Sequence, residues 1–547
     1  MPSSARSRAR GSGRRGAPRR SPRGRSSRTE ASIATEIELK LAARPRDLPA
    51  LTRALEARAA AGEGSRPARL ISTYFDTSDH ALARRGLALR VRECDGRFIQ
   101  TVKSHNRNGA GAFARGEWED PIGDARPDPQ AAASGRFLGP DIAARLVPLF
   151  RTEVSRRTVE LMPAPGTRIA AAIDRGRVCR PAGEAGEPIS EVELELQDGP
   201  ATALYDVALD LLAVAPVRLE RRSKAERGYR LTAADAAPPG AVRAAPVELA
   251  PQLSGNQALR RIGIACLDQL LRNEPAVLAG VAEGIHQMRV AVRRLRAMLA
   301  AFGRMLPSDQ RRRATAELRW LADALSTVRN LDVFEQALLA PAWPVLAESE
   351  GLAALTVAVR RRHDAADARA TRAIRSRRYT ALLLRLLRWF DGCLWQDAAT
   401  SPDLAQPITV IAARILARRR RLAKRRSKGF AKQSPEQRHR LRIALKKLRY
   451  ATEMLAGLYD AGAVERFTRR LKRLQDDLGD ANDLRVARDI IADLAKPAPG
   501  ASGDDAGIIV AAGNSLLQWH ERRLAAREPQ LRKHLDGLLA AEPFWTR

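Results

Sequence analysis

Charged and apolar residues alternate in several short segments of this chain. In Thr35–Leu41 (TEIELKL) two glutamates and a lysine occupy alternate positions, and Ile189–Leu196 (ISEVELEL) places three glutamates in the same way. Because the side chains of a strand point alternately to its two faces, each segment predicts a strand with one charged and one apolar face. Carboxylates of this kind can hold a divalent cation, and neighbouring lysines and arginines can bind phosphate oxygens.

A charged strand face is usually a solvated surface, so a single segment of this kind would carry little weight. Further strands with charged faces are predicted at Leu87–Arg92, Phe98–Lys103 and Arg168–Ile173, and both signs of charge recur among the segments. If these faces converge inside a closed barrel, its lumen holds carboxylates beside lysines and arginines. Burying that much charge is unfavourable unless the groups pair or bind ligands. The pattern therefore favours a tunnel that binds a metal ion and a polyphosphate together.

A second set of cations lies on predicted helices of the C-terminal half. In His286–Leu299 a histidine and three arginines fall at i, i+3, i+7 and i+10, which places them on one stripe of a helix. The segment His439–Thr452 repeats this spacing 153 residues later, and Leu321–Val333 aligns with Leu474–Val486 at the same offset. Two segments that share one offset predict an internal duplication, with two similar helical bundles.

A basic stripe on a single helix is usually a solvated face, but two equivalent stripes, if apposed, would form one long positive groove. Such a groove suits a flexible chain of phosphates. Aromatic residues make up only 4% of the chain and do not interleave with these cations, which disfavours base stacking and leaves nucleic acid as the less favoured partner. The residues predicted to bind long-chain polyphosphate are His286, Arg289, Arg293, Arg294, Arg296, His439, Arg442, Lys446, Lys447 and Arg449.

The charge of the chain is unevenly distributed. The formal net charge is +33 over 547 residues. Residues 1–30 hold ten arginines and one acidic residue, residues 31–231 hold 31 basic and 28 acidic residues, and residues 232–547 hold 54 and 33. The basic flanks imply a polyanionic partner, although charge alone does not choose among nucleic acid, anionic lipid and polyphosphate.

The same composition predicts the domain organisation. We expect a disordered basic tail over residues 1–32, a strand-rich domain over 33–232, a Pro/Ala linker over 233–251 and a helical domain over 252–542. The sequence contains no run of 18 apolar residues, so no membrane insertion is expected. Four scattered cysteines fit a reducing cytoplasm.

The N-terminal segments closely resemble the CYTH family of triphosphate tunnel metalloenzymes. The resemblance covers about two hundred residues and begins with the ExExK signature at Glu36–Lys40. It continues through YFDT (Tyr74–Thr77), LRVR (Leu89–Arg92), TVK (Thr101–Lys103), RGEWE (Arg115–Glu119), PLFRTEVSRR (Pro148–Arg157), AAID (Ala171–Asp174), EVELEL (Glu191–Leu196) and SKAERGY (Ser223–Tyr229). The helical half resembles the CHAD domain, a polyphosphate-binding module, through the HxxRxxxRRLR run from His286 and the HxxRxxxKKLRY run from His439.

These resemblances imply a fold and a set of roles. The expected fold is an eight-stranded antiparallel β-barrel tunnel of the α+β class, followed by an all-α domain of two duplicated bundles. The family implies Mg²⁺ or Mn²⁺ held by Glu36, Glu38, Glu193 and Glu195. It implies a phosphate clamp of Lys40, Arg90, Arg92, Lys103, Arg115, Arg156 and Lys224, with Asp174 orienting one of the cations. Glu36, Glu38, Lys40 and Lys224 are the expected catalytic residues, and Glu117 is either a metal ligand or a partner of Arg115.

The function that follows from these residues is metal-dependent hydrolysis of inorganic triphosphate by the tunnel. The helical domain is expected to bind polyphosphate or to localise the enzyme on it, in the cytoplasm or on polyphosphate granules. Three alternatives stay open. The first is a non-catalytic scaffold of polyphosphate granules, and the second is a nucleic-acid-binding protein. The third is an enzyme that hydrolyses nucleoside or thiamine triphosphate or cyclises an adenylate.

Overall fold

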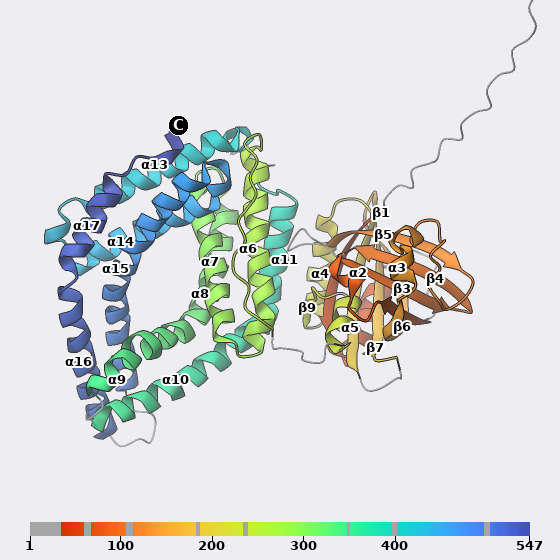
Figure 1. The fold of residues 1–547 in the computed structure, drawn as a ribbon, viewed down its shortest axis with the longest axis horizontal. Helices are drawn as coiled ribbons and strands as arrows, with labels where there is room; N and C mark the ends of the chain where they lie inside the picture. Colours follow the sequence, from red (N-terminus) through yellow and green to blue (C-terminus); the bar gives the residue numbers. More distant parts are fainter. Residues whose placement is uncertain are drawn as a thin grey trace, which may run out of the picture.

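The computed structural model describes residues 34–59, 67–104, 113–181, 186–232, 239–346, 350–396, 402–496 and 504–546. These residues form a β-barrel domain and a helical domain (Figure 1). The predicted tail, residues 1–32, lies outside the described residues. Within the described ranges, no helix is both long enough and apolar enough to cross a bilayer.

The first domain is a closed antiparallel barrel. Eight strands pair in the order β5-β4-β3-β2-β6-β7-β8-β1, and β5 also pairs with β1, which closes the sheet. A short ninth strand, β9, pairs with the other end of β1. The strands are β1 (Ala34–Ala43), β2 (Ala68–Asp76), β3 (Leu87–Cys94), β4 (Arg97–Ser104), β5 (Phe113–Ile122), β6 (Val147–Ala164), β7 (Thr167–Cys179), β8 (Glu187–Asp198) and β9 (Val217–Leu219). The predicted eight-stranded barrel is confirmed.

The charged side chains of β1 point into the barrel, and its apolar side chains point outward. On β1 the apolar Leu39 and Leu41 are buried outside the barrel in a core that includes Leu51 and Tyr205. The helices that supply these residues, α1 (Leu48–Glu56) and α4 (Thr202–Val214), therefore cover the outer face of β1, and the alternate residues of β1 are left for the lumen. The other elements of the domain are α2 (Ala81–Arg84), η1 (Gly135–Phe137), α3 (Pro140–Ala143) and α5 (Lys224–Thr232).

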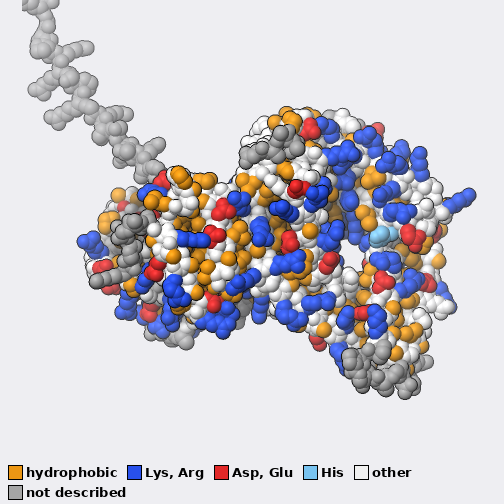
Figure 2. Space-filling view, turned by 180° about the vertical axis from the view of Figure 1, so that it is seen from behind, with side chains coloured by type: hydrophobic (Ala, Val, Ile, Leu, Met, Phe, Trp, Pro, Cys, Tyr) orange, Lys and Arg blue, Asp and Glu red, His pale blue; other side chains and the backbone are white. Residues whose placement is uncertain are grey.

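The second domain is an internal duplication. Helices α6, α7 and α8 begin 153 residues before α13, α14 and α15, respectively. The elements are α6 (Gly255–Leu278), α7 (Ala282–Ala301), α8 (Ser308–Val333), η2 (Phe334–Leu339), α9 (Ala340–Leu346), α10 (Glu350–Ile374), α11 (Arg377–Asp391), α12 (Pro402–Ala405), α13 (Ile408–Ser427), η3 (Phe430–Lys432), α14 (Pro435–Met454), η4 (Ala456–Leu458), α15 (Ala461–Leu494), α16 (Asp504–Ala525), α17 (Glu528–Leu539) and η5 (Phe544–Thr546). The predicted pair of bundles is confirmed. In the space-filling view this domain is hollowed in its middle (Figure 2).

The two domains pack directly on each other. Helix α11 lies against α4, and one hydrophobic core includes residues of both domains. Polar contacts border this interface: Arg388 contacts Asp206 at 2.6 Å, and the hydroxyl of Tyr205 donates to Asp391 at 2.5 Å. The barrel is therefore held against the first bundle (Figure 1).

The described part of the predicted linker, residues 239–251, also packs on the helical domain. The backbone of Val242 exchanges two hydrogen bonds of 2.8 Å with the side-chain amide of Asn273 on α6. Val247 and Leu249 are buried in the shared core. This segment has no helix or strand, but its backbone and apolar side chains are fixed by α6 and its neighbours.

Candidate functional site

The barrel encloses a cavity of about 350 Å³, which all eight of its strands and the start of α5 line. Eleven predicted site residues line it: Glu36, Glu38, Lys40, Arg90, Arg92, Lys103, Arg156, Asp174, Glu193, Glu195 and Lys224. Arg115 lies opposite Glu36 in the β1–β5 register, but its side chain is outside the described part of the chain. The alternation of the strands, as predicted from the sequence, therefore places both acidic and basic side chains in the barrel lumen.

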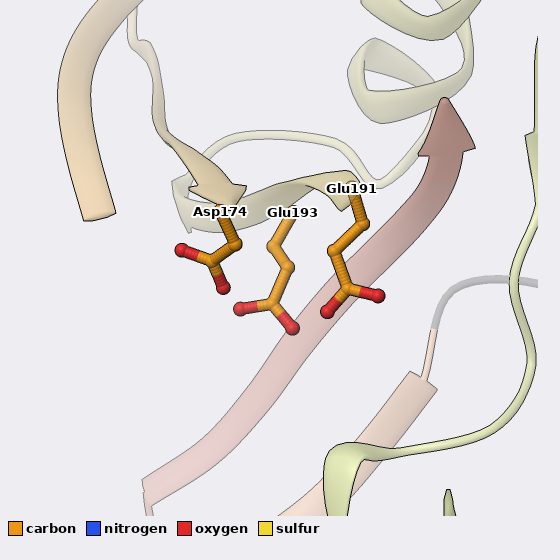
Figure 3. A group of neighbouring side chains, drawn as sticks. All are labelled: Asp174, Glu191 and Glu193. Carbon is orange, nitrogen blue, oxygen red and sulfur yellow. The ribbon is translucent and has the colours of Figure 1, made fainter. Parts of the chain in front are cut away.

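Three carboxylates gather at one end of the lumen around the ammonium group of Lys224. Asp174 on β7 and Glu191 and Glu193 on β8 lie side by side (Figure 3), with one oxygen from each within 4.8 Å of the others. The Lys224 Nζ contacts them at 2.7, 2.5 and 2.9 Å, respectively. Burial opposes the charged ammonium, but the three carboxylates outweigh burial and raise the pKa of Lys224.

Arg156 on β6 completes this end of the lumen. Its Nε and Nη2 donate to the two oxygens of Asp174 at 2.7 and 2.6 Å, and Nη2 also contacts Glu193 at 2.5 Å. This fork fixes both the position and the plane of the guanidinium. Lys40 on β1 contacts Glu193 at 2.8 Å and Glu38 at 3.3 Å. Although burial favours the neutral acid, Lys224, Lys40 and Arg156 together hold the pKa of Glu193 well below its usual range.

A second group of carboxylates in the lumen gathers around Lys103. Lys103 lies between Glu36 at 3.0 Å and Glu117 at 2.8 Å. Burial, with Glu36 and Glu38 nearby, raises the pKa of Glu195 despite the opposing effect of Lys103. Burial, opposed by Lys103 and reinforced by Glu36, raises the pKa of Glu117 to about 7. Carboxylates whose charge is costly in this way are suited to a bound cation.

The two carboxylate groups have different cationic neighbours. Asp174, Glu191 and Glu193 are surrounded by Lys224, Arg156 and Lys40, so their charge is already compensated. Glu36, Glu38 and Glu195 share Lys103 and Lys40 with other acids. Among the described residues, the three carboxylates whose oxygens lie close enough together to hold one ion are Asp174, Glu191 and Glu193. Of the four predicted metal ligands, Glu193 belongs to this group, and the four-glutamate ligand set stays a prediction.

Arg90 and Arg92 on β3 are two neighbouring cations that line the cavity. Arg90 lies 3.6 Å from Glu117 and 3.7 Å from Glu119. Arg90, then burial, then Arg156 lower the pKa of Arg92 to about 10. The Nε atoms of both arginines are buried and have no hydrogen-bond partner among the described residues. Donors left in this state are available to an anionic ligand.

Sequence reasoning missed several residues of the site. Glu191 shares the face of Glu193 and Glu195, so strand alternation could have added it to the metal candidates. Arg227, three residues after Lys224 on α5, donates to Glu191 at 3.2 Å and to Glu187 at 2.9 Å. Arg221 also lines the lumen, but it lies in an irregular segment before α5 and no sequence pattern marks it.

In the helical domain the two basic stripes face a common space. Helices α7 and α14 pack on each other. Burial, then Arg442, Arg293 and Arg449, lower the pKa of Lys446 to about 7, so a cation of α7 acts directly on α14. Burial and the nearby Arg293 likewise lower the pKa of Arg289 to about 10. The apposition on which the predicted groove depends is present, and Lys and Arg side chains gather beside the hollow of the domain (Figure 2).

Not every predicted cation lies on this groove. Arg294 is buried and donates to the side chain of Gln269 on α6 at 2.9 Å, so it faces the interior of the first bundle. Lys447 lies close to Arg419 and Arg426 of α13 and to Arg296, and these cations together with burial lower its pKa. The histidines His286 and His439 are half-buried near Arg289 and Arg442, and burial lowers the pKa of both histidines.

Comparisons with known proteins agree with this two-part architecture. The family model described as CYTH domain matches residues 34–229, and the model described as CHAD domain matches residues 261–492. An inorganic triphosphatase of Haemophilus influenzae is 32% identical over 161 residues, which are 29% of this chain and 45% of that protein. The chain therefore spans less than half of that relative.

Two further relatives cover more of the chain. An uncharacterized protein of Mycobacterium tuberculosis is 29% identical over 476 residues, which are 81% of this chain and 85% of that protein. Among solved structures, the CHAD domain from the plant Ricinus communis is 30% identical, with a TM-score of 0.48. The match covers 55% of this chain and 98% of that structure.

Proposed function

This chain carries a CYTH domain followed by a CHAD domain, and on that premise we propose that it is an inorganic triphosphatase that binds polyphosphate. The barrel hydrolyses inorganic triphosphate in a metal-dependent reaction, and the helical domain binds long-chain polyphosphate or localises the enzyme on it. The observation that carries the proposal is the lumen itself, where carboxylates and cations from all eight strands line one closed cavity.

The lumen favours a short inorganic chain of phosphates over an organic triphosphate. Tyr74 is the one aromatic side chain that lines the cavity among the described residues, and it is stacked on Phe150 with ring centroids 4.6 Å apart. Within the described ranges, no second aromatic ring lines the cavity to sandwich a base or a thiazolium. The arginines and lysines instead come from several strands, so they can bind the oxygens of a phosphate chain from several sides. Inorganic triphosphate therefore ranks ahead of nucleoside and thiamine triphosphate.

The proposed cation is Mg²⁺ or Mn²⁺, held by carboxylates of the predicted set Glu36, Glu38, Glu193 and Glu195, all of which line the one cavity. Carboxylate oxygens are the ligands that both ions prefer. When bound, the ion supplies positive charge to the phosphoryl oxygens and orients a water for attack on the terminal phosphorus. Glu193 also contacts Lys40 at 2.8 Å and Lys224 at 2.9 Å, so it orients both ammonium groups.

The residues of the chain contribute chiefly position and charge to phosphoryl transfer. Arg90 and Arg92 bind the phosphate chain from β3. Arg156 is held in one plane by Asp174, so its remaining donor edge is fixed before substrate arrives. Lys224 and Lys40 line the same cavity and are the proposed further partners of the phosphate oxygens. Preorganisation of this kind lowers the barrier because the charges need not reorient during the reaction.

The helical domain is proposed to bind polyphosphate along α7 and α14. The Nε atoms of Arg293 and Arg442 are buried and lack a hydrogen-bond partner within the described chain, whereas the Nε of Arg449 lies 3.4 Å from a carboxylate oxygen of Glu453. The cations of α7 and α14 lie close together there and outnumber the neighbouring acids, so they repel one another. A bound polyanion would relieve that repulsion. The four cysteines are unpaired, which supports a cytoplasmic location, free or on polyphosphate granules.

The test is phosphate release from tripolyphosphate with Mg²⁺ or Mn²⁺. The double variant Glu36→Ala, Glu38→Ala is compared with Glu160→Ala, an exposed glutamate on β6 of the same barrel. We expect the double variant to lose activity and the control to keep it. Equal activity in the double variant and the wild type would remove the enzyme proposal. Inactive wild type that still binds polyphosphate would favour the scaffold alternative.

A further inference from the structure

Arg419 on α13 is a buried arginine without a partner for its charge. It is 7% exposed, and its Nε and Nη2 atoms have no hydrogen-bond partner among the described residues. The charged residues that lie close to it, Arg418 and Lys447, are also cations. A desolvated guanidinium beside a second one is unfavourable unless an anion compensates it.

The duplication shows that the fold does not require this charge. Helices α6 and α13 begin 153 residues apart, so Arg419 corresponds to Cys266 in the first repeat. Cys266 is fully buried in the hydrophobic core. A small apolar residue thus serves the same packing position in one repeat, while the other repeat carries an unpaired cation.

Further cations lie in this part of the domain, on α7, α13 and α14 and in the turn after α7. Lys447 of α14 lies close to Arg419, Arg426 and Arg296, and Arg418 lies close to Arg304. Within the described chain no acidic side chain comes within 4 Å of the charged atoms of Arg296, Arg304, Arg418, Arg419 or Lys447, whereas most cations of the barrel lumen pair with carboxylates. The position equivalent to Lys447 is Arg294, whose charge is accommodated by Gln269.

We infer that Arg419 and Lys447, flanked by Arg296, Arg304 and Arg418, form a further anion site that takes phosphate groups of a polyphosphate chain. Arg296 lies one helical turn, about 5 Å, beyond Arg293, so the site continues the groove of α7 and α14 onto α13. This inference rests on the proposed polyphosphate binding and deepens it. It predicts that the domain binds a long chain more tightly than triphosphate, because a long chain has enough phosphates to contact both cation groups at once.

The test uses the full chain and isothermal titration with long-chain polyphosphate at several salt concentrations. Arg419→Met keeps the apolar stem of the side chain and removes its charge. We expect affinity for the long chain to fall about tenfold and the salt dependence to become shallower, because one phosphate contact is lost. The matched control is Arg421→Met, on the exposed face of the same helix, which should change neither quantity by as much.

Thermal unfolding separates a binding role from a packing role. Without polyphosphate, Arg419→Met should melt at or above the temperature of the wild type, because an uncompensated buried charge has been removed. Polyphosphate should then raise the melting temperature of the variant less than that of the wild type. A variant that melts lower and binds polyphosphate as the wild type does would overturn the inference, as would equal losses for Arg421→Met.

Two more variants distinguish this inference from the proposal beneath it. Arg293→Met and Lys446→Met remove cations of the α7–α14 groove. If neither variant weakens polyphosphate binding, the proposed groove fails and the α13 site falls with it. If both weaken binding while Arg419→Met binds like the wild type, the groove stands and only the α13 site is refuted.

Discussion

Replacing Lys224 by methionine should destabilise the barrel and abolish its activity. The Lys224 ammonium contacts three carboxylates at 2.5 to 2.9 Å, and its side chain is 10% exposed. Removing one partner from a buried ion cluster costs about 3–5 kcal/mol, because the other charges stay buried. For a domain of this size, that loss lowers the melting temperature by on the order of 10 °C.

The pH dependence of this variant should have a definite sign. In the wild type the pKa values of Asp174 and Glu193 are lowered by their cations, so both acids contribute stability at neutral pH that is lost as the pH falls through those values. Without Lys224, burial and mutual repulsion raise the carboxylate pKa values instead. The deficit of the variant should therefore be larger at pH 7 than at pH 5, where protonation relieves the repulsion.

The assay is thermal unfolding at both pH values, together with phosphate release from tripolyphosphate. Lys472→Met, at an exposed position of α15, removes the same charge without breaking a cluster and serves as the control. If Lys224→Met and the control have the same melting temperature at pH 7, the argument that the ammonium compensates the three acids is refuted. Retained hydrolysis would refute its role in the reaction.

Three further changes test other parts of the site. Arg156→Lys keeps the charge but loses the fork on Asp174, so we expect tripolyphosphate hydrolysis to fall at least about tenfold, measured as kcat/KM. Glu195→Gln should raise the Mg²⁺ or Mn²⁺ concentration needed for half-maximal activity, and an unchanged metal dependence would argue against Glu195 as a ligand. Because the pKa of Lys446 is lowered to about 7, the ammonium is lost as the pH rises above 7. Polyphosphate binding should therefore weaken over that range, and Lys446→Arg should flatten the dependence in titrations at pH 6 to 9.

Strand alternation was enough to predict which residues face the lumen. The positions of Glu36, Glu38 and Lys40 follow directly from their spacing, because residues two apart on a strand share a face. The spacing does not predict partners across the barrel, since these depend on register and on where α5 docks. The convergence of Asp174, Glu191 and Glu193 on Lys224 is a contact of that kind. The four-glutamate ligand set was a family inference and stays a prediction.

Helical spacing was less informative for the second domain. The 153-residue offset predicted the duplication, and the structure confirms it from α6 to α15. A stripe on a helix does not reveal which side the neighbouring helices cover, so Arg294 was grouped with the groove although it bonds to Gln269. The unpaired Arg419 was also not found, because a charged run such as that of α13 looks the same whether it is solvated or buried.

The contact between the first bundle and the barrel bears on how the protein can be handled in pieces. Asp268 and Glu274 of α6 bind Arg221 and Arg218, at 2.7 Å for the Arg221–Asp268 pair. Arg218 belongs to β9, which pairs with β1, and Glu220 hydrogen-bonds the backbone of Lys40 at 2.9 Å. A barrel expressed without its helices would lose the acids that hold this segment and would expose the apolar surface of α4. Kinetic constants from such a truncated barrel would describe a rearranged tunnel mouth, so the intact chain is the proper unit for enzymology.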